Sequence, residues 1–343
     1  MASKMVLIFG MAIGLYTGSL VASACAQEYK KAESPRPLGR MVDLGGYKFH
    51  INCIGEGNPT VVLSIGGGGL STDWALVQSK VAAFTRVCSY DRSGAAWSDL
   101  GPKPRTMDQE AFDLHRLLTA AGERGPYVVV GQSIGGMVVR IFTEKYRSEI
   151  AAVVLVDAYS EDSQLFTNGK MQRMRLAAKN RPVPTPRTSV AAMDGMTPAE
   201  LQQTETFVKK YIGNPKIDPP YDKLPEYAQR VRLWAVQQPK NYAEDDDYMA
   251  EISARMYAQD QVQEHPLGSV PLIVLTRDKD KHDYQGPLTA SLVKEHEEQQ
   301  ALMVKLSTHG SQIVVPNSGH HIELEAPDKV VAAVHEIAVY SGK

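Results

Sequence analysis

The chain is organised around the segment Tyr127-Val128-Val129-Val130-Gly131-Gln132-Ser133-Ile134-Gly135-Gly136-Met137-Val138-Val139. Its β-branched start is too short for a helix and predicts a strand, whereas the residues after the turn have helical character. The intervening Gly-x-Ser-x-Gly pattern predicts a sharp turn with Ser133 exposed at its tip, where Cβ atoms at Gly131 and Gly135 would not fit. A helix that begins at the serine would point the N–H of Ile134 at a developing oxyanion. A glycine-rich loop with a capping serine is the alternative.

The first 26 residues have the pattern of a targeting signal. Lys4 supplies a positive charge, residues 5–21 are apolar, and small residues follow up to Ala26. Cleavage after Ala26 predicts a secreted or periplasmic protein. A lipoprotein signal acylated at Cys25 ranks second, because Ala22 stands where such signals usually carry leucine, and a retained anchor ranks third. No later stretch is long and apolar enough to span a bilayer, so no stable membrane insertion is expected after cleavage.

The composition agrees with a globular enzyme rather than with a charged binding tail. Hydrophobic residues make up 43% of the chain, and the formal net charge is −2. Nothing in this balance indicates a nucleic-acid partner or an anionic membrane surface. A chain of this size can bury one large core, or a core and a smaller lid.

Strands and helices alternate through the first half of the chain. Residues 41–54 predict an antiparallel hairpin at a sheet edge, and residues 60–65 form an apolar run suited to burial on both faces. That run enters Gly66-Gly67-Gly68-Gly69, where backbone can approach a ligand; we expect Gly67 N–H to be a second oxyanion donor. No Lys-Ser/Thr follows, which excludes a P-loop. With the apolar run 151–156, the alternation predicts a parallel α/β architecture.

Two features of the first half favour structural roles. The charged turn at Asp91 and Arg92 follows a strand and is expected to hold neighbouring loops by hydrogen bonds. Of the three cysteines, Cys53 and Cys88 lie in separate strand-like runs. They could form a disulfide in an oxidising compartment, or they could be two buried thiols.

Between residues 161 and 266 strand-like runs give way to helical signatures. Thr197-Pro198-Ala199-Glu200 is a capping box with proline in the first turn. Clustered prolines mark loops between the helices. The acidic run 244–247 is expected to be a solvated charge run rather than a calcium site.

Several motifs occur in a fixed order along the chain. They are the glycine run at 66–69, Asp-Arg-x-Gly-x-x-x-Ser-Asp at 91–99, Gly-Gln-Ser-x-Gly-Gly at 131–136, Leu-Val-Asp at 155–157 and Asn-Ser-Gly-His-His at 317–321. This order resembles the α/β-hydrolase superfamily, and within it the lid-bearing serine esterase-like members. The resemblance implies a mostly parallel, eight-stranded sheet with helices on both faces and a helical lid inserted after strand six. One departure is Ile65-Gly66, where many members carry His-Gly.

The resemblance also implies the organisation of the chain. Residues 1–26 would be the signal, 27–160 and 267–343 the two parts of the hydrolase core, and 161–266 the lid. In this family the second strand lies beside the fourth. Cys53 and Cys88 would then lie on adjacent strands, which favours a disulfide.

By the same resemblance, Ser133 is the nucleophile, His320 the general base and Asp280 the acid of a catalytic triad. The loop after the seventh strand usually carries the acid, and its pattern favours Asp280 over its neighbours Asp278 and Asp283. Asp157, after the sixth strand, is the alternative location. His296, in a helical segment without the second histidine of a zinc helix, is expected to lie on the surface.

The expected reaction is the hydrolysis of a carboxylic ester in a small acyl substrate, through an acyl-enzyme and without metal or cofactor. An amide, peptide or carbon–carbon bond hydrolase and an acyltransferase are alternatives on the same fold. A non-catalytic envelope binding protein on a hydrolase scaffold is an alternative of another class.

Overall fold

The computed structural model describes residues 29–167, 170–192, 194–243, 248–282, 286 and 288–341. The predicted signal with Cys25, the acidic run 244–247 and Asp283 lie outside the described residues. Within them, no helix is long and apolar enough to cross a membrane.

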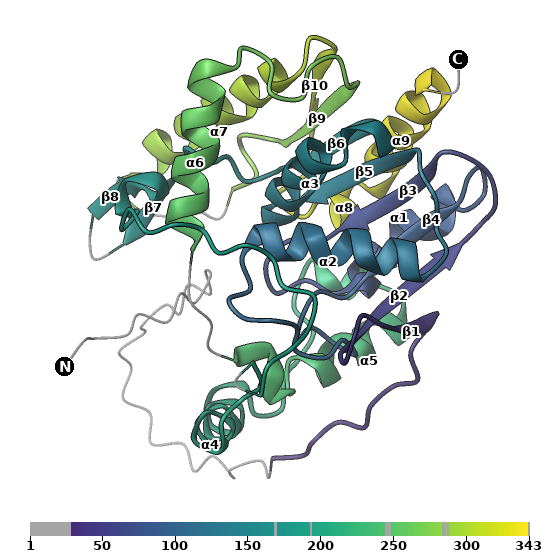
Figure 1. The fold of residues 1–343 in the computed structure, drawn as a ribbon, viewed down its shortest axis with the longest axis vertical. Coiled ribbons are helices and arrows are strands. Elements are labelled where there is room, and N and C mark those ends of the chain that lie inside the picture. Colours follow the sequence, from purple (N-terminus) through teal and green to yellow (C-terminus); the bar gives the residue numbers. More distant parts are fainter. Residues whose placement is uncertain are drawn as a thin grey trace.

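A twisted sheet of eight strands runs through the molecule (Figure 1). Its spatial order is β1-β2-β4-β3-β5-β6-β9-β10. β1 and β2 form the predicted antiparallel edge hairpin, β2 pairs antiparallel with β4, and all later pairs are parallel. The predicted eight-stranded, mostly parallel sheet is therefore confirmed. The strands are β1 (Arg40–Asp43), β2 (Lys48–Ile54), β3 (Thr60–Ser64), β4 (Val87–Tyr90), β5 (Tyr127–Gln132), β6 (Ile150–Val156), β9 (Leu272–Arg277) and β10 (Gly310–Val315).

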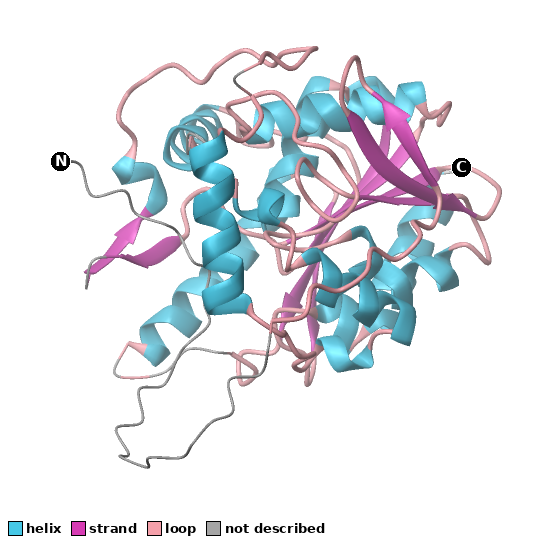
Figure 2. Ribbon diagram, turned by 90° about the horizontal axis from the view of Figure 1, so that it is seen from below, coloured by secondary structure: helices cyan, strands magenta, loops and turns pink. Residues whose placement is uncertain are grey.

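Helices cover both faces of this sheet (Figure 2). β3, β5 and β9 are buried along their whole length, because parallel strands covered on both faces need apolar side chains in both directions. One apolar core lies under α2 and α3, and a second lies under α1 and α9. These elements are α1 (Ala75–Val81), α2 (Met107–Ala120), α3 (Ile134–Lys145), α7 (Thr289–Met303), α8 (Ile322–Glu325), α9 (Pro327–Ser341) and the short turns η1 (Ser71–Trp74), η2 (Arg147–Glu149) and η7 (Val304–Leu306).

In the described part of the segment between β6 and β9, helices recur as the sequence predicts, but they alternate with long loops. The capping box at Thr197 and Glu200 is present at the start of α4. A two-stranded hairpin, β7 with β8, stands apart from the main sheet and was not predicted, because its short strands mix polar and apolar residues without a long apolar run (Figure 1). The elements are β7 (Gln164–Thr167), β8 (Lys170–Arg173), η3 (Met174–Ala177), α4 (Pro198–Phe207), η4 (Val208–Ile212), η5 (Tyr221–Lys223), α5 (Glu226–Ala235), η6 (Pro239–Tyr242) and α6 (Met249–Val262).

The extended residues 29–38, which precede β1, are held on both the sheet side and the α5 side. The N–H of Ala32 donates to Gln237 Oε1 at 2.7 Å, just beyond the end of α5. Trp97 Nε1 donates to Pro35 O at 2.9 Å from the loop after β4. Residues 29–38, here called the N-terminal leg, therefore connect the β6–β9 segment to the core.

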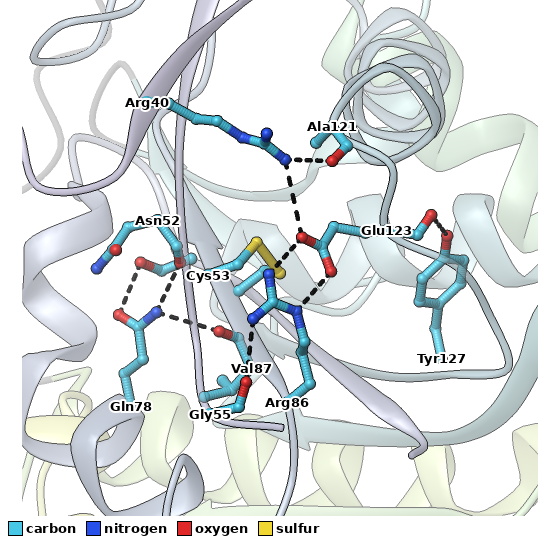
Figure 3. Close-up of a disulfide and its surroundings, with 12 residues drawn as sticks. Arg40, Asn52, Cys53, Gly55, Gln78, Arg86, Val87, Ala121, Glu123 and Tyr127 are labelled. Atoms are coloured by element: carbon cyan, nitrogen blue, oxygen red, sulfur yellow. Dashed lines mark hydrogen bonds and ion pairs between the residues drawn. A yellow bond between two sulfur atoms is a disulfide. The ribbon is translucent and has the colours of Figure 1, made fainter. Parts of the chain in front are cut away.

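A disulfide joins Cys53 on β2 to Cys88 on β4, with an S–S distance of 2.08 Å (Figure 3). The two residues are direct partners in the antiparallel register, so the pairing implied by the family resemblance is confirmed. Beside it, Arg86 forms two hydrogen bonds with the Glu123 carboxylate, at 2.7 and 2.8 Å. This two-point contact suits the planar guanidinium and ties β4 to the residues that precede β5.

Candidate active site

The predicted turn at Ser133 is present between β5 and α3. Ser133 adopts φ 52° and ψ −125°, a conformation that costs energy for a residue with a side chain. A Cβ on Gly131 would lie 2.6 Å from the carbonyl oxygen of Gly135, and one on Gly135 would lie 2.4 Å from that of Ser64. Only glycine fits at either position, so the residues of this motif build a turn that leaves Ser133 half-buried at the carboxyl edge of the sheet.

His320 follows β10 and reaches the same edge. Its Nδ1 lies 2.7 Å from Asp157 Oδ2, and Asp157 directly follows β6. With Nδ1–H donated to this carboxylate, Nε2 carries the lone pair that a general base needs. The Gln132 amide Nε2 lies 3.3 Å from His320 Nε2 and donates to His320 O at 3.2 Å. Gln132, the residue before Ser133, therefore links the histidine loop to the serine turn.

The carboxylate that contacts His320 is the alternative, Asp157, and not the preferred Asp280. Asp280 is exposed, and its backbone N–H donates to Asp278 Oδ1 at 3.0 Å. Asp278 is also not a partner of the imidazole: its Oδ2 accepts the backbone N–H of Asn317 at 2.9 Å. β6 and β9 are neighbours whose carboxyl ends share one edge, so sequence position alone did not distinguish their carboxylates.

Asp157 is 2% exposed and is surrounded by nitrogen atoms. Oδ1 accepts the backbone N–H of Arg277 at 3.1 Å, and Oδ2 lies 3.4 Å from Arg277 Nη1. His296 Nε2 lies 2.9 Å from Oδ1, although its N–H direction departs from the line of a hydrogen bond. Burial opposes ionisation, but the contacts with His296 and His320 hold the pKa of Asp157 well below its usual range.

His296 was expected on the surface and instead contacts the buried carboxylate. Its side chain is 16% exposed. The sequence contained one signal for this, because His296, Gln299 and Gln300 share one helix face by their spacing. Gln132 and Arg277 were also missed, since neither residue type is diagnostic at these positions.

The glycine loop after β3 lies against the serine turn. A Cβ on Gly66 would be 2.8 Å from Ser133 Cβ, and one on Gly67 would be 3.6 Å from Ile134 Cδ1. The N–H of Gly66 is used by Gln132 Oε1 at 3.1 Å. In the described part of the chain, no hydrogen bond is made by the N–H of Gly67, which keeps it available for a ligand.

The predicted support of the loops by Asp91 and Arg92 is confirmed. Asp91 Oδ1 accepts the N–H of Ser71 at 2.7 Å, and its Oδ2 lies 2.8 Å from Nδ1 of the buried His50. Arg92 donates to Gly66 O. The start of the glycine loop and the first residue of η1 are therefore both held from the turn after β4.

The β6–β9 segment contacts both loops of the site. Arg232 on α5 pairs with Asp73 Oδ2 at 2.8 Å, and the same oxygen accepts the N–H of Leu70, which ends the glycine loop. The Arg232 guanidinium also lies 3.4 Å from the centre of the Tyr221 ring. Tyr221 in turn hydrogen-bonds His321 Nε2 at 3.2 Å, next to His320.

A family model described as the Alpha/beta hydrolase family matches residues 61–334, which include both the serine turn and His320. The chain belongs to the alpha/beta hydrolase family. An AB hydrolase superfamily protein of Gibberella zeae is 22% identical over 81% of this chain and 86% of its own length. A probable transporter of Hormonema carpetanum is 31% identical over 35% of this alpha/beta hydrolase, but the match spans only 18% of the transporter's length.

Solved structures share the fold of this alpha/beta hydrolase at low identity. A thermophilic esterase from Thermogutta terrifontis has a TM-score of 0.54 at 20% identity, over 87% of this chain and 95% of its own. An enol-lactonase from Burkholderia xenovorans LB400 has a TM-score of 0.55 at 15% identity, over 88% and 100%. The epoxide hydrolase CorEH has a TM-score of 0.54 at 16% identity, over 88% and 98%. These neighbours have different reactions, so the likeness shows the fold alone.

Proposed function

We propose that this alpha/beta hydrolase cleaves carboxylic esters with Ser133 as nucleophile, His320 as general base and Asp157 as the acid of the triad. The observation that carries the proposal is the 2.7 Å contact between His320 Nδ1 and Asp157 at the edge where the strained Ser133 turn lies. A serine hydroxyl is nearly inert at its own pKa and needs an adjacent base. The His320–Asp157 pair is the arrangement that supplies one.

In the proposed first step, Ser133 Oγ gives its proton to His320 Nε2 and attacks the ester carbonyl carbon. Asp157 keeps the imidazole in the required tautomer and stabilises the imidazolium. The tetrahedral intermediate then collapses: the carbon–oxygen bond to the alcohol breaks, and His320 returns the proton to the leaving oxygen. Water, deprotonated by the same imidazole, releases the acid and restores Ser133.

The negative charge on the carbonyl oxygen needs donors that are already in position. We assign this role to the N–H groups of Gly67 and Ile134, because the loop at Gly67 lies against Ile134 and the α3 N-terminus favours negative charge. Each such donor contributes about 3 kcal/mol to the transition state.

Residues 161–266 are proposed to form the lid over this site and to select the acyl substrate. The contacts of Arg232 with Asp73, whose carboxylate accepts the N–H of Leu70 next to the glycine loop, and of Tyr221 with His321 in the histidine loop support this role. The substrate class is a small acyl ester.

Labelling with a fluorophosphonate tests the catalytic assignment. Mass spectrometry should find the adduct on Ser133, and Ser133→Ala should abolish both labelling and turnover of p-nitrophenyl esters. Esters of increasing chain length, aminoacyl amides and diketones separate the ester hydrolase from same-fold alternatives. A protein that folds, fails to react with the probe and turns over none of these substrates would instead be a non-catalytic binding protein.

We also propose that the protein acts outside the cytoplasm. The Cys53–Cys88 disulfide supports this location, because disulfides persist in oxidising compartments. The mass of the mature N-terminus distinguishes cleavage after Ala26 from a lipid anchor on Cys25. An intact N-terminus in the cytoplasmic fraction would contradict the proposal.

A further inference from the structure

One face of α7 holds the segment that follows β6. Gln300 Nε2 donates to Ala158 O at 2.7 Å, and Gln299 Oε1 accepts the Ser160 hydroxyl at 2.7 Å. His296 lies one turn earlier on the same face and contacts Asp157. Three side chains at positions i, i+3 and i+4 thus contact residues 157, 158 and 160.

The two oxygens of the Asp157 carboxylate each have an imidazole. Oδ2 contacts His320 at 2.7 Å, and Oδ1 contacts His296 at 2.9 Å. Arg277 also contacts both oxygens: its backbone N–H donates to Oδ1, and its Nη1 lies near Oδ2. Rotation of the carboxylate toward one imidazole would therefore move it away from the other.

We propose that His296 is a positioning residue for the hydrolytic reaction, because it fixes the plane of the Asp157 carboxylate and, through it, the direction of the His320 ring. This inference rests on the proposed function of Ser133, His320 and Asp157. His296 forms no bond with the substrate and transfers no proton in the reaction. Its effect is geometric: the His320 Nε2 lone pair must face Ser133 Oγ in the first step and the leaving oxygen in the next.

Errors in such positioning lower the rate of the chemical step more than they weaken substrate binding. His296→Leu should therefore lower kcat by roughly 10- to 100-fold while KM changes little. His296→Gln keeps an N–H near the position of the imidazole Nε2 and should recover most of kcat. His296→Asn is polar but too short, and should behave like the leucine variant.

His115→Leu is the matched control. His115 is also a partly exposed helical histidine 2.9 Å from a carboxylate, that of Glu149, and it lies outside the proposed site. Its replacement should leave kcat and KM unchanged. The four variants and the wild type are compared as full-length processed protein, with p-nitrophenyl ester turnover and circular dichroism.

The inference is overturned if His296→Leu folds and retains kcat within about threefold of the wild type. It is also overturned if the asparagine and glutamine variants have equal kcat. This second comparison keeps the test valid if the leucine variant fails to fold. Failure of the proposed function has a different signature, since Ser133→Ala would then retain full turnover.

Discussion

The loops after β6 and β9 begin side by side at one edge of the sheet, and each carries carboxylates. The burial and the hydrogen-bond partners of these carboxylates differ between the two loops. In the first loop Asp157 is buried and contacts two imidazoles and Arg277. In the second loop Asp280 is exposed, and Asp278 binds backbone N–H groups. The position of a loop in the fold therefore brings a carboxylate to the edge of the sheet where the site lies. Its burial and its contact partners decide whether it can pair with the histidine.

The pKa values of Asp157 and Asp278 move in the same direction for different reasons. For Asp157, burial raises the pKa, but the neighbouring imidazoles outweigh burial and lower it. For Asp278, the N–H groups of Asn317 and Asp280 lower the pKa at the surface. The two lowered pKa values therefore do not distinguish the carboxylates, whereas the 2.7 Å contact of Asp157 with His320 does.

Replacing one carboxylate at a time tests most directly which of the two loops supplies the catalytic acid. Asp157→Asn keeps the shape of the side chain but can donate to His320 Nδ1 and so favours the wrong tautomer. We expect kcat for ester hydrolysis to fall by about 10⁴-fold. Asp280→Asn, at an exposed position, should stay within about twofold of the wild type. Steady-state turnover of both purified variants checks this, and the opposite ranking would return the acid to the β9 loop.

Acid unfolding tests the contacts of the buried Asp157 carboxylate. The pKa of Asp157 is lower in the folded state than the ordinary value of about 4, so its contribution is present above that pH and is lost as the pH falls further. A carboxylate paired in this way contributes roughly 2–3 kcal/mol to stability. Urea unfolding between neutral and strongly acidic pH should show a shallower pH dependence for Asp157→Asn. Equal slopes for the variant and the wild type would contradict the assigned contacts.

A smaller effect than that of Asp157→Asn is expected at Asp278. Its carboxylate accepts the backbone N–H of Asn317, three residues before His320, and so connects the β9 loop to the histidine loop. Asp278→Ala should therefore hold the histidine loop less firmly in place. We expect kcat to fall by less than about tenfold, with a slightly lower melting temperature. Thermal unfolding and turnover of this variant are compared with those of Asp280→Ala. A loss as large as that of Asp157→Asn would give Asp278 a role beyond support.

Much of this molecule follows from local sequence. The β-branched runs predicted the buried strands, and the glycines around Ser133 predicted the turn, because both depend on residues close in the chain. The carboxylate that contacts His320 could not be identified in this way. Whether Asp157 or Asp280 meets His320 depends on how two loops leave adjacent strands, which involves residues 163 and 40 positions from the histidine. His296 was misjudged for the same reason, since its partner lies on another element.

The N-terminal leg has a practical consequence for anyone producing this enzyme. This segment precedes the first strand. Its contacts with Gln237, just after α5, and with Trp97, in the loop after β4, connect α5 to the core. A gene trimmed to begin at β1 would remove these contacts, leave the indole N–H of Trp97 without Pro35, and loosen the support behind Arg232. An expression boundary upstream of residue 29, with any affinity tag at the carboxyl terminus, keeps this fastening whole.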